Sequence, residues 1–174
     1  MDDTEGKFNA AFEKHSDELF RHCSMRISDR ERALELTQET FLRAWEYLAR
    51  GEEIRQYRSF LYRILNNLIV DEYRKHKSQS LDALLENEET AVAVEGTLLR
   101  DESDELEEAM VRFDSKRAVK ALQTLPEHYK AVLTFRYIDG LGLSEIAECT
   151  GESENVISVR IHRGLHKLRD MLAL

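Results

Sequence analysis

Near its C-terminus the chain reads GLGLSEIAECTGESENVISVRIHRGLHKLRDML, which covers residues 140–172. Ser153 is placed as the N-cap of a helix over residues 156–172. The apolar stripe of this helix repeats at steps of three and four and consists of Ile157, Ile161, Leu165, Leu168 and Leu172. Its exposed face consists of Asn155, Ser158, Val159, His162, Arg163 and His166. A short helix, a tight turn at Gly151 and this second helix predict a helix-turn-helix that binds DNA.

The net charge of −9 is unusual for a nucleic-acid-binding protein until it is divided along the chain. Residues 1–77 hold 14 basic and 15 acidic side chains, whereas residues 116–174 hold 9 basic and 7 acidic side chains. Residues 78–115 hold 2 basic and 12 acidic side chains, so the excess acid lies almost wholly there. The pattern predicts two small domains, residues 5–77 and 116–174, joined by a flexible acidic linker over residues 78–115.

Hydrophobic periodicity predicts that both domains are all-α. In the first domain we expect an opening helix over residues 8–27, a second helix that begins at a capping box of Ser28 and Glu31 and ends at Gly51, and a third capped by Ser59. The apolar side of the second helix is expected to comprise Ala33, Leu34, Thr37, Phe41, Ala44, Trp45 and Leu48. The third helix is expected to bury Phe60, Leu61, Ile64, Leu65, Leu68 and Ile69 and to expose Arg63, Asn66, Asn67, Arg74, Lys75 and Lys77.

In the second domain a helix is expected to stop at Pro126, and the next helix is expected to end near Gly140.

Cys23 and Cys149 lie far apart without a CxxC motif, so buried thiols are expected rather than a disulfide or a zinc site. His162 and His166 are four residues apart on one helix, but no third ligand of suitable spacing accompanies them. We therefore expect no metal and no cofactor.

Other classes of protein are disfavoured by what the sequence lacks. No apolar run approaches the ~20 residues of a membrane span, and the N-terminus is acidic, so a cytoplasmic location without membrane insertion is expected. The sequence contains no phosphate-binding glycine loop and no nucleophile motif, so we expect no enzymatic activity.

Two sets of motifs resemble the two DNA-binding regions of one bacterial family. The first set consists of LTQETFLRAW (residues 36–45), FLYRILNN (residues 60–67), Asp71 and Arg74. The second set consists of LPE (residues 125–127), GL (residues 140–141), EIA (residues 145–147), Gly151, RIHR (residues 160–163) and KLR (residues 167–169). In this order, and without a region 3 between them, the two sets resemble regions 2 and 4 of sigma factors of the extracytoplasmic-function type.

The resemblance implies a protein that binds core RNA polymerase and promoter DNA and that is controlled by an anti-sigma factor. In such sigma factors region 2 binds a coiled coil of the beta-prime subunit and captures the melted minus-10 element. Region 4 binds the beta flap and reads the minus-35 duplex. The positions that match the polymerase-binding helix are Glu35, Gln38, Glu39 and Arg43. The positions that match the minus-10 region are Arg55, Tyr57, Arg58, Arg63, Asn66, Asn67 and Arg74.

The chemistry of these side chains suits single-stranded DNA, because an aromatic ring can stack on an unpaired base and arginines can bind phosphates. Asp71 lies three residues before Arg74 and is expected to hold its guanidinium. Phe60 stands where many relatives have a Trp, which removes an indole N–H donor from this region.

The positions that match the minus-35 reader are Ser153, Asn155, Ser158, Val159, Arg160, His162, Arg163 and Lys167. Among them Arg163 is the expected bidentate partner of a guanine, a contact typically worth ~1–3 kcal/mol of discrimination. Val156, Ser158 and Val159 depart from the commonest residues of the family, so the promoter sequence cannot be copied from relatives. Gly142 stands where a serine cap is usual, although glycine is a tolerable cap.

Several alternatives stay open at the level of sequence. The acidic linker is expected to enter the nucleic-acid channel of the polymerase, as family linkers do, but it is also compatible with a solvated spacer. The whole chain is compatible with a free-standing helix-turn-helix regulator, which would bind duplex DNA tightly without polymerase. A third alternative is an adaptor whose amphipathic helices serve a protein partner.

Overall fold

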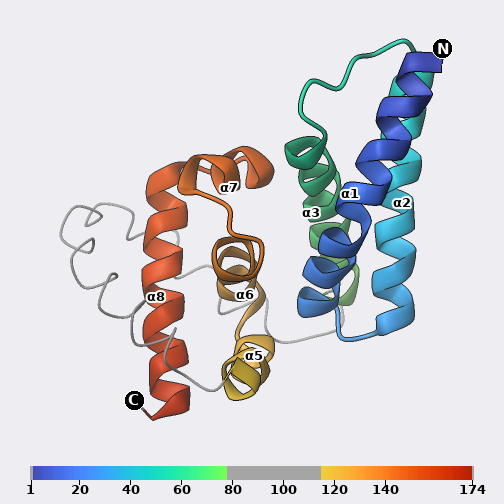
Figure 1. Cartoon of the computed structure of the whole chain (residues 1–174). Helices are drawn as coiled ribbons and strands as arrows, with labels where there is room; N and C mark the ends of the chain where they lie inside the picture. The colour runs from blue at the N-terminus through green and yellow to red at the C-terminus, as the bar shows by residue number, and fades with distance from the viewer. Residues whose placement is uncertain (1, 78–114, 174) are drawn as a thin grey trace. The chain divides into compact units, whose positions relative to one another are not determined.

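The computed structural model describes residues 2–77 and 115–173, and all regular structure within these ranges is helical (Figure 1). The all-α prediction is therefore confirmed. The predicted linker lies outside the described residues except for Ser115, with which the helix α5 begins. The chain divides into two compact units, one built on α1 to α3 and the other on α5, α6 and α8. None of the helices in the described part of the chain is long and apolar enough to cross a membrane.

The first unit consists of α1 (Asp2–Arg26), α2 (Arg30–Ala49) and α3 (Tyr57–Lys77), and each of these helices packs against the other two. The side chains between them form an apolar core that includes Leu19, Cys23, Ala33, Ala44, Leu61, Tyr62, Leu65 and Ile69. Full burial of one such side chain typically stabilises a fold by ~1.5–3 kcal/mol, so this core supports the arrangement of the three helices.

Two predicted helix starts are wrong, and one predicted stop is confirmed. The N-cap of α2 is Asp29 rather than Ser28, because the Asp29 carboxylate accepts hydrogen bonds from the backbone N–H groups of Glu31 and Arg32, at 3.0 and 3.2 Å. The helix α3 begins at Tyr57, so Ser59 lies within its first turn rather than at its cap. Gly51 follows the end of α2 with φ of +87°, a conformation that glycine adopts without strain.

The buried side of α2 differs from the predicted side at its edges. Leu34 and Trp45 are exposed, whereas Leu36 and Thr40 are buried. The Thr40 hydroxyl donates to the Leu36 carbonyl oxygen at 2.8 Å, so this polar group is buried without losing a hydrogen bond. The core side of α2 is therefore rotated slightly from the stripe that apolar residues alone suggest.

The second unit contains α5 (Ser115–Thr124), α6 (Glu127–Leu133), the π-helical turn η3 (Thr134–Ile138) and α8 (Glu154–Leu172). Pro126 separates α5 from α6, and Gly140 follows η3 with φ of +72°, as predicted. The π-helical turn itself was not predicted. Between η3 and α8 lies α7 (Leu143–Thr150), and all five residues of the predicted α8 stripe are buried.

Candidate nucleic-acid interface

The turn that joins α7 to α8 has the caps of a helix-turn-helix. Gly142 precedes α7, and its backbone N–H donates to Oε2 of Glu145 at 2.7 Å, which is one half of a capping box. Gly151 turns the chain with φ of +76°. The Ser153 hydroxyl then accepts from the backbone N–H of Val156 at 3.3 Å, so the predicted cap of α8 is confirmed. The N–H groups at the start of a helix generally favour a nearby phosphate.

The helix α8 is anchored on α6 through a close contact at Gly164. A Cβ added to Gly164 would lie 3.0 Å from Cδ1 of Leu133 and 3.4 Å from Cβ of Tyr129. The Lys167 ammonium lies 5.3 Å from the centre of the Tyr129 ring, which is a cation–π contact between the same two helices. Because this packing leaves little room between α6 and α8, it sets the position of the side of α8 that the sequence predicts to face DNA.

The predicted minus-35 residues fall into three groups by exposure. Ser153, Asn155 and Lys167 are exposed, and Ser158, Arg160 and Arg163 are half-buried. Arg160 forms an ion pair with Glu152 of the preceding turn. All six are therefore accessible at least in part.

Val159 and His162 are buried, with relative exposures of 8% and 7%, so the prediction that they lie on the exposed face is wrong. His162 precedes the buried Leu165 by one helical turn, and its ring packs edge-on against His166, with ring centres 4.4 Å apart. Val159 has no polar atom that would favour solvent, so its burial is favourable in itself. Among the described residues, no three His, Cys, Asp or Glu side chains gather in a way that could hold a metal ion.

Most of the predicted minus-10 residues lie at the surface of the first unit. Arg55, Arg63, Asn67 and Arg74 are exposed, while Tyr57 is half-buried, and burial raises the pKa of its phenol. The guanidinium of Arg74 lies 3.9 Å from the Asp71 carboxylate, which confirms the predicted pair. These residues extend from the loop before α3 to its C-terminal end.

Asn66 is the exception, because it is buried with 5% exposure rather than exposed as predicted. Its side-chain oxygen accepts a hydrogen bond of 2.8 Å from the guanidinium of Arg26, which is itself buried. The same guanidinium lies 3.2 Å from Nε2 of His22, and the Tyr73 hydroxyl donates to the Arg26 carbonyl oxygen. A buried charge needs such partners, so Asn66 belongs to a polar cluster of the core. The sequence carried no signal that separated Asn66 from Asn67.

Arg58 is held by an acidic residue of α1. Its guanidinium donates to both carboxylate oxygens of Glu18 at 3.2–3.3 Å and lies 5.6 Å from the centre of the Tyr62 ring. Nδ1 of His15 lies 2.5 Å from the same carboxylate. Burial raises the pKa of Glu18, but the hydrogen bonds from Arg58 and His15 outweigh burial and leave that pKa below its ordinary value. The ionised Glu18 thus fixes Arg58 near the loop that precedes α3.

Phe60 packs against Tyr47, with ring centres 4.9 Å apart.

The predicted polymerase-binding residues share an accessible face of α2. Glu35, Gln38 and Arg43 are exposed, and Arg43 donates to Glu39 at 3.0 Å. Three apolar side chains that were not predicted to be exposed lie among them, namely Leu34, Leu42 and Trp45. Leu34, Gln38 and Leu42 are four residues apart, so helical geometry places them on one side. This face combines apolar and charged groups, as the centre and rim of protein interfaces do.

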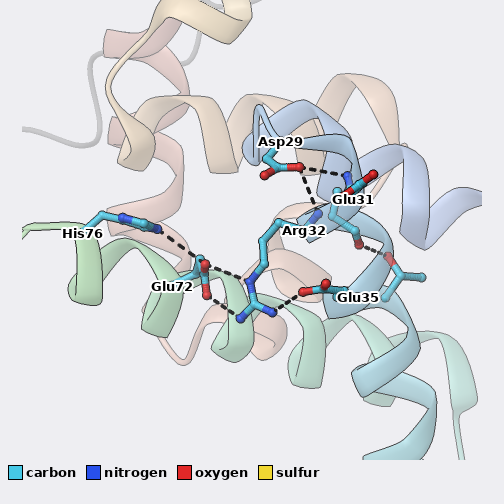
Figure 2. A network of polar contacts seen from close by, with 8 residues as sticks. Asp29, Glu31, Arg32, Glu35, Glu72 and His76 are labelled. Atoms are coloured by element: carbon cyan, nitrogen blue, oxygen red, sulfur yellow. Dashed lines mark hydrogen bonds and ion pairs between the residues drawn. The ribbon is translucent and has the colours of Figure 1, made fainter.

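An ion-pair network joins α2 to α3 near the start of α2 (Figure 2). Nε and Nη2 of Arg32 donate to the two carboxylate oxygens of Glu72 at 2.9 and 2.7 Å, and Nη1 donates to Glu35 at 2.8 Å. Nε2 of His76 lies 3.5 Å from Glu72. The hydrogen bonds from Arg32 lower the pKa of Glu72. This network was not predicted. Glu72 follows the same three- and four-residue spacing as the buried Leu61, Leu65 and Leu68, but it is a charged residue.

Comparison with known proteins agrees with this arrangement. Residues 11–79 match the family Sigma-70 region 2, and residues 115–168 match the family Sigma-70, region 4. The chain is similar to the ECF RNA polymerase sigma factor SigW of Bacillus subtilis, with 30% identity over 165 residues that cover 91% of this chain and 84% of the relative. It is also similar to the ECF RNA polymerase sigma factor SigL of Mycobacterium tuberculosis, with 28% identity over 161 residues that cover 92% and 85% of the two chains.

The fold is shared with the sigma factor RpoE of Bartonella quintana, solved in complex with the anti-sigma factor NepR. The TM-score is 0.67 at 17% identity, and the match covers 97% of this chain and 98% of that chain. A unit that matches Sigma-70 region 2, followed by a helix-turn-helix unit that matches Sigma-70, region 4, places the chain among DNA-binding transcription proteins. The chain belongs to the extracytoplasmic-function family of RNA polymerase sigma factors.

As a member of this family, the chain is a sigma factor that binds core RNA polymerase and directs promoter-specific transcription initiation. The free-standing regulator is not favoured, because a matching region 2 precedes the helix-turn-helix.

Proposed function

We propose that three surfaces of the chain divide the work of initiation. The exposed face of α2 binds the beta-prime coiled coil, the α3 region captures the melted minus-10 element, and α8 reads the minus-35 duplex while its unit binds the beta flap. The observation that carries this proposal is the helix-turn-helix itself, with α8 capped by Ser153, anchored at Gly164 and presenting Arg163. The recognition helix of such a motif places its N-terminal part against base edges.

For polymerase binding we propose Glu35, Gln38, Glu39 and Arg43, together with the exposed Leu34 and Leu42. Leu42 is 55% exposed, so its burial against a partner removes apolar surface from water. The surrounding charged side chains supply a rim that orients the partner and excludes partners of the wrong charge.

For minus-10 capture we propose Tyr57 as a stacking surface and Asn67 as a group that can donate to and accept from a base edge. We propose Arg55, Arg58, Arg63 and Arg74 as phosphate contacts. Holding an unstacked base costs a few kcal/mol, which stacking on an aromatic ring can offset by ~1–3 kcal/mol. Asn66 is left out of this set because Arg26 occupies its side-chain oxygen.

For the minus-35 element we propose Asn155, Ser158 and Arg163 as base contacts, and Ser153, Arg160 and Lys167 as phosphate contacts. Val159 and His162 are left out because their side chains are buried. None of these roles involves a covalent step, so we propose that the chain has no catalytic activity of its own and requires no cofactor.

We propose that an anti-sigma factor controls this chain, as suggested by the complex in which its structural relative RpoE was solved. We also propose that the chain acts in the cytoplasm together with core polymerase. The residue limits of the two domains, 5–77 and 116–174, and the role of the acidic residues 78–115 stay proposals.

The decisive experiment mixes the purified chain with bacterial core RNA polymerase and a fragmented genomic DNA library and sequences the 5′ ends of the transcripts. We expect chain-dependent transcripts that start downstream of one shared two-part motif. The absence of such transcripts, together with no co-elution with a well-matched core polymerase, would favour the free-standing regulator instead.

The upstream half of that motif tests the assignment of Arg163. Replacing Arg163 with alanine should relax discrimination at one base pair by ~1–3 kcal/mol. The matched control is Arg160→Ala on the same helix, which removes a half-buried arginine proposed above as a phosphate contact. That control should weaken binding about equally across sequences, because phosphate contacts carry no sequence information. Equal effects of both variants on every sequence would contradict the base-reading role of Arg163.

A further inference from the structure

The Arg32–Glu72 pair stands where the apolar core of the first unit gives way to charge. Glu72 is buried on the side of α3 that also buries Leu61, Leu65 and Leu68, so it occupies a position where an apolar residue would continue the stripe. Arg32 reaches it from the first turn of α2 with two parallel hydrogen bonds of 2.7 and 2.9 Å. A bidentate arginine–carboxylate pair fixes direction as well as distance.

The guanidinium of Arg32 has a third contact, and this contact lies on another functional surface. Nη1 donates to Glu35 at 2.8 Å, and Glu35 belongs to the exposed face of α2 that we propose for polymerase binding. Figure 2 shows the guanidinium between the two carboxylates, with Glu72 on one side and Glu35 on the other. Because the donors of a guanidinium are held in one plane, Glu35 and Glu72 cannot move independently while both are bound.

The other end of this link lies close in sequence to the proposed minus-10 contacts. Glu72 follows Asp71 and precedes Arg74 by two residues, and His76 lies 3.5 Å from its carboxylate. The last turn of α3 holds Arg74, Lys75, His76 and Lys77. Glu72 therefore lies one turn from the basic end of the helix that we propose for minus-10 capture.

We propose that Arg32 is a positioning residue that couples the polymerase-binding face of α2 to the DNA-binding end of α3. The proposal rests on the function proposed above for these two surfaces. When polymerase engages Glu35, the guanidinium of Arg32 transmits the position of that carboxylate to Glu72. Capture of the minus-10 element is thereby tuned to polymerase binding.

The nature of the pair argues for a role beyond stability. Replacing a partly buried ion pair by apolar side chains of similar volume is often neutral or stabilising, so such a pair is not needed to hold two helices together. What apolar side chains cannot supply is the directed link from Glu72 to Glu35. Arg32→Lys should also lose it in part, because a single ammonium cannot reproduce the bidentate geometry.

The test uses the full chain with core polymerase and two readouts, the dissociation constant for core and the fraction of open promoter complex at saturating core. Glu35→Gln should mainly weaken core binding, and Glu72→Gln should mainly lower open-complex formation. Arg32→Gln should impair both, each by about threefold to thirtyfold.

The double variant R32Q/E72Q should form no less open complex than R32Q alone, because both substitutions remove the same Arg32–Glu72 interaction. Arg21→Gln removes the same charge from an exposed position of α1 and should change neither readout.

A folding control keeps the result interpretable. Thermal unfolding followed by circular dichroism identifies variants that no longer fold, and R32M/E72M supplies an apolar pair that should fold while both readouts stay impaired. A folded R32M/E72M variant with wild-type values in both readouts would overturn the proposal, as would fully additive effects of R32Q and E72Q. A wild-type chain that yields no core-dependent transcripts would overturn the proposed function and this coupling with it.

Discussion

Two neighbouring asparagines show how much depends on the direction of a single side chain. Asn66 is in the core and accepts from the buried Arg26, whereas Asn67 is exposed. Asn66→Ala should lower the free energy of unfolding by about 2–3 kcal/mol, since a buried charged donor loses an acceptor. Asn67→Ala should change it by less than ~0.5 kcal/mol but should weaken minus-10 capture. Urea unfolding and binding to a single-stranded minus-10 oligonucleotide measure the two effects.

A reversed pattern, with stability lost in Asn67→Ala and retained in Asn66→Ala, would contradict this assignment. Periodicity could not separate the two asparagines, because it assigns faces by residue type and both residues are amides. What placed Asn66 inside was Arg26, forty residues earlier, and no local pattern reveals such a partner.

The Glu72 carboxylate makes stability depend on pH in a defined direction. Arg32 lowers its folded-state pKa, so the unfolded chain takes up the proton more readily. The contribution of Glu72 to stability is therefore fully present above its ordinary pKa of ~4.3 and is lost as the pH falls through the lower folded-state value. The difference in free energy of unfolding between wild type and Glu72→Gln should be largest near neutral pH and should shrink as the pH falls below the ordinary pKa of a glutamate.

Urea unfolding at a series of pH values measures this difference, and Glu13→Gln on the exposed side of α1 is the matched control. A difference for Glu72→Gln that stays constant down to low pH would show that the Arg32–Glu72 bond does not depend on ionised Glu72. Arg32 and His76 are the charged or titratable groups that contact this carboxylate, and Arg32 has the shorter contact. Glu35 is linked to it only through the guanidinium of Arg32.

At the scale of the helices, the packing of α8 on α6 depends on a missing side chain. A Cβ at Gly164 would lie 3.0 Å from Cδ1 of Leu133, which is itself buried. Gly164→Val should therefore lower the free energy of unfolding of this unit by about 1–3 kcal/mol, through overpacking. Hydrogen exchange of the α6 and α8 amides should rise, and binding to the minus-35 duplex should fall.

Gly6 is the control for this substitution because it is also helical, but a Cβ added there would have no neighbouring atom within 4 Å. Gly6→Val should change the free energy of unfolding by less than ~1 kcal/mol, because only helix propensity is altered there. A Gly164→Val chain with unchanged exchange in α6 and α8 would mean that Leu133 moves aside at little cost.

The helices were largely predictable because apolar periodicity and glycine or proline breaks act locally. The stop at Gly51, the break at Pro126 and the cap at Ser153 are confirmed for this reason. The start of α2 was misplaced by one residue because Ser28 and Asp29 can both cap a helix, and the carboxylate of Asp29 is the stronger acceptor. The π-helical turn η3 has no comparable local signal in the sequence.

For the molecule as a whole, the distribution of charge matters more than its total. The net charge of −9 arises almost entirely from residues 78–115, whereas residues 116–174, which contain the helix-turn-helix, are slightly basic. Acidic side chains tethered to a DNA-binding unit repel DNA over about one Debye length, ~8–10 Å at physiological salt. The intact chain should therefore bind promoter DNA poorly until polymerase is present.

Replacing the acidic residues of this segment with serine and glutamine, at constant length, tests both interpretations of it. Without polymerase, the neutralised chain should bind minus-35 duplex about tenfold more tightly than wild type at low salt, and the difference should vanish at high salt. If the segment also enters the nucleic-acid channel of polymerase, holoenzyme formation should weaken and the pattern of abortive products should change. Tighter DNA binding with unchanged holoenzyme formation and abortive products would leave the solvated spacer as the correct interpretation. In that case the acid would act only as an electrostatic barrier, which keeps this sigma factor off DNA until it has joined core polymerase.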